Sequence, residues 1–138
     1  MPLRIIVTKK ESGIFIVSLV GSIDSETCMN LDKEIGKVLD SSPKGIIFNM
    51  EGVNYISSLG LSIMFRIKKA VEKIGGTLIM TGIQPKIKKV FDAVKFIPDH
   101  IFENMAEANK HFDDFLAYVQ REETEEPDAF PFTEYRNA

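Results

Sequence analysis

The sequence predicts an α/β fold, a single domain built around one mixed, mostly parallel β-sheet. Three observations lead to this prediction. Short apolar runs rich in β-branched residues alternate with segments of helical periodicity along most of the chain. The length of 138 residues is that of one domain. The composition, 44% hydrophobic and 27% charged, is typical of a soluble globular protein.

The first predicted elements are a β-hairpin and a helix. Residues 3–9 and 13–21 are two β-branched runs joined by a short loop that contains glycine, which predicts antiparallel strands. A helix is then expected from about Ser25 to Leu39, where apolar residues recur at steps of three and four. Asp24 and Ser25 offer side-chain oxygens that can cap its start.

The remaining elements alternate between strand and helix. Residues 45–50 are almost continuously apolar, as in a strand covered on both faces, so this strand is expected at the centre of the sheet. Residues 53–56 lead to a second helix that starts near Ser58 and ends at Gly75-Gly76. Further elements are expected as a strand at 77–81, a helix at 85–94, a brief strand at 100–102 and a fourth helix from Asn104 or Met105 to about Val119. This alternation predicts about five strands, parallel after the hairpin, flanked by about four helices.

Several function classes are disfavoured by residues that the chain lacks. Cys28 is the single cysteine and the histidines are His100 and His111, so neither an internal disulfide nor a structural zinc site is expected. Glycine-rich phosphate loops and a G-x-S-x-G turn are missing, so we predict a protein that is not an enzyme and needs no cofactor. No window approaches the about 18 apolar residues of a membrane helix, and the expected location is the cytoplasm, without membrane insertion.

Charge divides the chain into two parts, a domain at 1–120 and an acidic tail at 121–138. The tail holds six acidic residues against Arg121 and Arg136 and is predicted to be disordered. The alternative is that Phe130-Pro131-Phe132 docks as a short motif on a partner or on the domain's own basic helices. Residues 66–95 are rich in lysine, but these lysines fall at the solvent positions of two amphipathic helices. Because no aromatic side chains are interleaved with these lysines in the way that a base-stacking surface needs, direct binding of nucleic acid is not expected.

The turn before the second helix is the candidate functional site. It carries Ser57 and Ser58 where a parallel strand ends and a helix begins, which is where ligands and partners meet such folds. Two interpretations stay open from the residues alone. A serine at this point can be an ordinary helix cap, or it can carry a phosphoryl group that the helix N-terminus stabilises.

A resemblance to a known family covers residues 3–118. It rests on short motifs in a fixed order: SLVGSID at 18–24, GIIFN at 45–49, YISSLGL at 55–61, IGGTL at 74–78, and IQP at 83–85 followed by apolar residues of the third helix. In this order they resemble the STAS domain, named for sulfate transporters and anti-sigma factor antagonists. The resemblance implies a stand-alone antagonist that binds an anti-sigma factor, itself a serine kinase, and is switched off by phosphorylation. A phosphatase that resets the switch is a further implied partner.

The resemblance also implies site residues. The family's acceptor serine falls on Ser58, its following glycine on Gly60 and its leucine on Leu61, and Asp24 matches a family aspartate near the same site. Two positions depart from the family motif: Ser57 replaces an aspartate and Leu59 replaces a serine. Ser57 is therefore an alternative acceptor.

The predicted partner face consists of Asp24, Ser57, Ser58, Gly60, Leu61, Ser62 and Phe65. Leu61 and Phe65 are four residues apart and lie off the apolar stripe of the second helix, so both exposed anchoring and core packing stay open. The departures from the motif also favour an alternative function, a constitutive STAS-type subunit of a membrane transport ATPase that is not phosphorylated.

Overall fold

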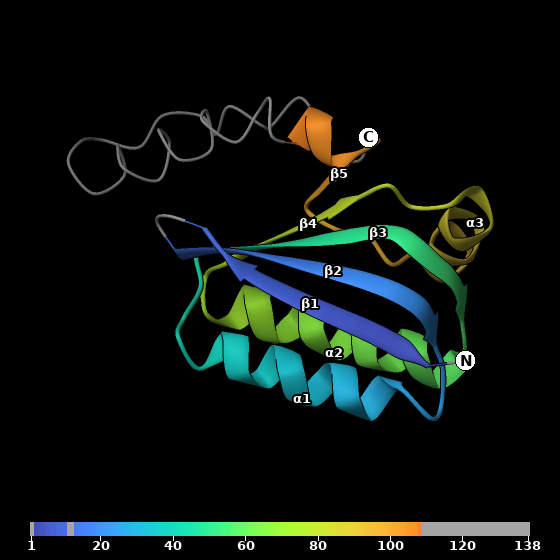
Figure 1. Ribbon diagram of the computed structural model, residues 1–138, viewed down its shortest axis with the longest axis horizontal. Coiled ribbons are helices and arrows are strands. Elements are labelled where there is room, and N and C mark those ends of the chain that lie inside the picture. The colour runs from blue at the N-terminus through green and yellow to red at the C-terminus, as the bar shows by residue number, and fades with distance from the viewer. Residues whose placement is uncertain (1, 11–12, 109–138) are drawn as a thin grey trace.

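The structure is a computed structural model that describes residues 2–10 and 13–108. Figure 1 shows one sheet with helices packed against it. The elements in chain order are β1 (Leu3–Lys9), β2 (Ile14–Ile23), α1 (Cys28–Leu39), β3 (Gly45–Ile56), α2 (Ser58–Lys73), β4 (Thr77–Thr81), α3 (Pro85–Val94) and β5 (His100–Phe102).

The sheet follows the order of the chain, β1-β2-β3-β4-β5. The hairpin β1–β2 is antiparallel, and each later neighbour pairs in parallel. This confirms the predicted fold class and the central place of the apolar strand β3. Figure 1 shows α1 and α2 side by side across one face of the sheet, whereas α3 lies at the end of the molecule where β3 turns into α2.

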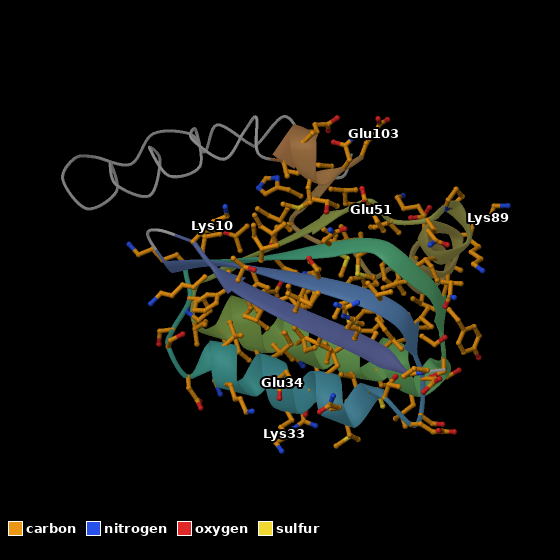
Figure 2. All side chains as sticks on the ribbon, viewed as in Figure 1. Lys10, Lys33, Glu34, Glu51, Lys89 and Glu103 are labelled. Atoms are coloured by element: carbon orange, nitrogen blue, oxygen red, sulfur yellow. The ribbon has the colours of Figure 1, made fainter. Side chains whose placement is uncertain are left out.

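The main core fills the space between the sheet and the two long helices. Alternate residues of β2, namely Phe15, Val17 and Leu19, are buried in it together with Phe48 of β3. Every second residue in the middle of β2 is buried, and buried residues recur on the helices at steps of three and four. These patterns give the strand and the helices one apolar face each, and the apolar faces pack together. Charged side chains such as Lys33 of α1 point outward from this layer (Figure 2).

Three elements have bounds that differ from the predictions. Helix α1 begins at Cys28 rather than Ser25, because the Asp24 carboxylate accepts hydrogen bonds from the N–H groups of Glu26 and Thr27 and forms a separate turn before the helix. Strand β2 runs from Ile14 to Ile23 instead of over residues 13–21.

Strand β3 is also longer than expected. It is continuous from Gly45 to Ile56, so the predicted strand at 45–50 and the segment 53–56 are one element. Its pairing with β2 shifts register between Ser18 and Val20 and again between Gly21 and Ser22. Such irregularities let a strand continue past residues that break simple alternation.

The start of the predicted fourth helix is confirmed. Residues 105–108 are helical, and the Asn104 side chain caps them by accepting a hydrogen bond from the Glu107 N–H at 2.8 Å. The rest of this predicted helix and the predicted disordered tail at 121–138 lie outside the described residues.

Candidate partner-binding site

The candidate site lies where β2 and β3 end at the same edge of the sheet. Ile23 and Ile56 are paired as the last residues of the two strands, and the Ser57 N–H donates to the Ile23 carbonyl at 2.9 Å. Asp24 and Ser57 each follow one of these paired residues. The sheet therefore brings together the two turns that the sequence singled out, although they are more than thirty positions apart.

The two serines have different surroundings. Ser57 is the N-cap of α2, and its half-buried hydroxyl accepts a hydrogen bond from the Gly60 N–H at 3.0 Å. Ser58 is the first residue of the helix and is exposed. Within the described part of the chain, the Ser58 hydroxyl has no hydrogen-bond partner. The cap interpretation thus applies to Ser57, while Ser58 presents its hydroxyl to the solvent.

Gly60 is required by the close approach of α2 to the end of β2. A Cβ atom at this position would lie 2.4 Å from the Ile23 carbonyl oxygen, which is backbone and cannot move aside easily. The glycine lets the first turn of α2 pack directly on the strand. It thereby holds Ser57 and Ser58 at the sheet edge.

Asp24 does not reach toward the serines in a hydrogen bond. Its Oδ1 atom accepts from the N–H groups of Glu26 (2.9 Å) and Thr27 (3.1 Å). Partial burial raises the pKa of Asp24, but these backbone bonds and the Thr27 hydroxyl outweigh that effect, so the net pKa is lowered. Asp24 is therefore a turn-forming carboxylate that stays ionised at neutral pH.

A threonine that sequence reasoning missed completes this turn. The Thr27 hydroxyl donates to the Ser22 carbonyl at 2.7 Å and accepts from the Asp24 N–H at 3.0 Å. The Asp-x-x-Thr spacing is a signal that could have predicted it, because both side chains commonly bond to nearby backbone groups.

The two predicted apolar anchors differ in their exposure to solvent. Leu61 is half-buried and packs against the core, whereas Phe65 is 39% exposed. Ser62 is exposed, and its hydroxyl donates to the Ser58 carbonyl at 3.2 Å. Leu59, which departs from the family motif, is 46% exposed and adds an apolar side chain that the predicted face did not include.

The start of α2 gives this site a positively polarised helix end. The first turn of α2 carries no acidic residue, so its positive N-terminal end is not neutralised from within the helix. In the part of the chain that the structure describes, no three histidine, cysteine or acidic side chains are grouped to hold a metal ion. Among the same residues, no helix is both long and apolar enough to cross a membrane.

These features define a small α/β domain whose sheet begins with a β-hairpin and whose second helix starts with a serine at the strand ends. The family model of the STAS domain matches residues 6–108. The chain therefore belongs to the STAS domain family, as the sequence resemblance predicted.

Two anti-sigma factor antagonists are similar to this chain in sequence. BtrV of Bordetella bronchiseptica, named as a proposed anti-sigma factor antagonist, is 25% identical over 99 residues, which are 72% of this chain and 85% of BtrV. The anti-sigma-F factor antagonist RsfB of Mycobacterium tuberculosis is 32% identical over 64 residues, 46% of this chain and half the length of RsfB.

A solved structure agrees with this architecture. The anti-sigma factor antagonist SpoIIAA in its unphosphorylated form superposes with a TM-score of 0.65 at 18% identity, covering 80% of this chain and 98% of SpoIIAA. At this identity the likeness establishes the fold.

Proposed function

We propose that this chain is an anti-sigma factor antagonist that works by binding and not by catalysis. Membership of the STAS family and the names of BtrV and RsfB support this assignment. Its partner is an anti-sigma factor that is also a serine kinase, and binding releases the sigma factor. The proposed binding face is the set Asp24, Ser57, Ser58, Gly60, Leu61, Ser62 and Phe65, to which we add the exposed Leu59.

The observation that carries the proposal is the state of the Ser58 hydroxyl. It is exposed at the first position of α2, and no hydrogen bond holds it within the described residues. A kinase must reach the acceptor oxygen, and a phosphatase must reach the phosphoryl group, so an exposed and unbonded hydroxyl suits both. Ser57 suits them less well, because its hydroxyl is half-buried and caps the helix.

Phosphorylation of Ser58 would act on binding through local electrostatics. A phosphoryl group adds a charge of about −1.5 to −2 at neutral pH. In the free chain the N-terminal end of α2 favours that charge, so the domain stays folded. In a complex the charge would be buried against the partner at a cost of several kcal/mol, enough to weaken a micromolar complex by about 100-fold or more.

The first test is a binding titration with the anti-sigma factor kinase of the source organism. Ser58→Asp places a negative charge at the acceptor and is expected to weaken binding by about 100-fold without unfolding the domain. Ser42→Asp is the matched control, because Ser42 is an exposed serine between α1 and β3, at the opposite edge of the sheet. Unchanged affinity of Ser58→Asp would contradict the proposal.

A second function is favoured by the departures at Ser57 and Leu59. No carboxylate lies on the first turn of α2 to assist a kinase, and the exposed Leu59 enlarges the apolar part of the face. Both features suit a constitutive subunit of a membrane transport ATPase. Such a subunit would co-purify with the ATPase, and its binding would not change when ATP or a kinase is added. An antagonist would instead dissociate from its partner when ATP is added.

A further inference from the structure

A basic groove of about 620 Å³ lies beside α2 and the segment that follows α3. Two apolar residues, Phe65 and Ile97, and four cations line most of it; the cations are Arg66, Lys68, Lys69 and Lys95. We call this set the α2 groove. It overlaps the proposed partner face at Ser62 and Phe65 but extends away from Ser58 along the helix.

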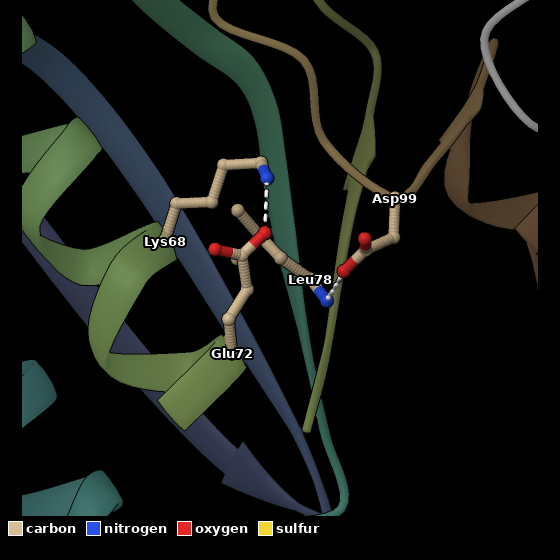
Figure 3. A network of polar contacts seen from close by, with 4 residues as sticks. All are labelled: Lys68, Glu72, Leu78 and Asp99. Atoms are coloured by element: carbon tan, nitrogen blue, oxygen red, sulfur yellow. Dashed lines mark hydrogen bonds and ion pairs between the residues drawn. The ribbon is translucent and has the colours of Figure 1, made fainter. Parts of the chain in front are cut away.

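The walls of the α2 groove are fixed by specific contacts. Phe96, which is buried, packs edge-on against the Phe65 ring with centroids 5.1 Å apart and also contacts Phe91 at 4.8 Å. At the other end of the segment, Asp99 accepts a hydrogen bond from the Leu78 N–H at 2.7 Å (Figure 3). The Asp99 N–H returns a bond to the Leu78 carbonyl at 2.9 Å. The segment with Lys95 and Ile97 is thus attached to α2 on one side and to β4 on the other.

The α2 groove combines exposed apolar surface with unneutralised positive charge. Phe65 is 39% exposed and Ile97 is 51% exposed. Lys68 pairs with Glu72 of the same helix (Figure 3), and Arg66 lies 3.7 Å from Asp32. Lys69 and Lys95 have no carboxylate partner within the described residues. An occupant should therefore be acidic and carry aromatic or other large apolar side chains.

Lys95 is held in an unusual conformation at this place. It ends α3 with a φ of 59°, in the left-handed region that usually favours glycine. This backbone conformation is less favourable in free energy for lysine than for glycine. The positive charge of lysine is nevertheless favourable at the C-terminal end of the helix.

We propose that the chain's own acidic tail, residues 121–138, docks in the α2 groove. This segment has the required chemistry, because six acidic residues surround Phe130, Phe132 and Tyr135. The acids complement Lys69 and Lys95, and the rings fit the apolar surface of Phe65 and Ile97. The docked tail would cover part of the proposed partner face, but the contact itself does not depend on that function.

The tail is long enough to reach the groove. Twenty-one residues separate Ala108, the last described residue, from Phe130. Extended chain covers about 3.3 Å per residue, so this connection spans up to about 70 Å. A compact domain of this size has a radius of gyration of about 14 Å. The connection therefore reaches any point of the surface, even if half of it is helical.

The test uses a spin label on the full chain. Thr133→Cys introduces an attachment site next to Phe132, and Cys28 does not react because it is fully buried. We expect the label to broaden the amide signals of Phe65, Lys69 and Ile97. The double variant Lys69→Glu/Lys95→Glu should lose this broadening. Lys89→Glu is the matched control, because Lys89 lies on the outer side of α3, does not line the groove and points away from the body (Figure 2).

Two further measurements test whether the tail of the same chain occupies the α2 groove and which interactions hold it there. Mixing isotope-labelled chains without a spin label and unlabelled chains that carry it reports contacts between molecules; broadening in that sample overturns docking within one chain. Replacing Phe130 and Phe132 by alanine should reduce the broadening, and 1 M salt should reduce it further, because the Debye length falls to about 3 Å. Broadening that survives both the charge-reversed groove and high salt, or none at the groove in the first place, overturns the proposal.

Discussion

Two strand-to-helix turns meet at one edge of the sheet, and they use similar polar residues in different ways. In the turn from β2 to α1, Asp24 and Thr27 bond to neighbouring backbone groups. In the turn from β3 to α2, Ser57 does the same, but Ser58 leaves its hydroxyl exposed. A satisfied polar group shapes the backbone, whereas an unbonded one is available to another molecule. This difference is why we propose the switch at the second turn.

Gly60→Ala should have the largest effect on stability, because the new methyl group would push the start of α2 away from the end of β2. The new Cβ would meet the Ile23 carbonyl at 2.4 Å, so α2 must shift from the strand end. We expect a loss of about 1–3 kcal/mol in the free energy of unfolding, measured by urea denaturation. Gly36→Ala on α1 is the matched control: its Cβ meets nothing within 4 Å, and it should be neutral or stabilising by up to about 1 kcal/mol. Equal effects of the two substitutions would refute the close-approach argument.

Thr27→Val tests whether the first turn depends on its hydroxyl. Valine keeps the shape of threonine but loses the bonds to the Ser22 carbonyl and the Asp24 N–H. The expected loss is about 1–2 kcal/mol in the free energy of unfolding. Thr8→Val on the exposed β1 strand should change stability by less than about 0.5 kcal/mol. Thermal unfolding of both variants decides the point.

Replacing each serine by alanine compares the contributions of the two hydroxyls in the second turn to stability. Ser57→Ala removes the bond to the Gly60 N–H and should cost about 1 kcal/mol of stability, the usual value of a helix cap. Ser58→Ala removes no hydrogen bond of the described residues and should change stability by less than about 0.5 kcal/mol. If Ser58→Ala proved the more destabilising of the two, the cap would be misassigned.

The smallest expected effect is a pH dependence from Asp24. Its pKa in the folded chain lies below the ordinary value of 3.8, so ionisation favours folding. This contribution is present above the unfolded pKa and is lost as the pH falls through the folded pKa. Asp24→Asn keeps the oxygen acceptor and removes the charge. The stability difference between wild type and this variant should therefore be constant near neutral pH and shrink below about pH 4.

Much of the fold followed from local patterns. Strands β1, β4 and β5 and helix α3 have the predicted bounds, because each is a compact run with a clear period and ends at glycine, proline or polar residues. The predicted start of α1 was wrong, because Asp24 and Thr27 form a turn whose hydrogen bonds compete with helix formation. The length of β3 depends on pairing with β2, a contact between distant residues that no local pattern contains.

The place of the candidate site in the fold could be predicted from the sequence, but the contacts of its side chains could not. A hydroxyl pair between a strand and a helix marks the place, and the family motif singles out Ser58. Which serine caps the helix depends on the backbone of the first turn, and the exposure of Leu59 depends on how α2 sits on the sheet. The α2 groove was not predicted, because Lys95 and Ile97 reach it through the packing of Phe96.

The most direct test of the account is the intact mass of the full chain after incubation with ATP and the anti-sigma factor kinase of the source organism. Wild type and Ser57→Ala should each gain one phosphoryl group, and Ser58→Ala should gain none. Phosphate that persists in Ser58→Ala, or that is lost only in Ser57→Ala, would contradict the claim that Ser58 is the residue presented to the kinase.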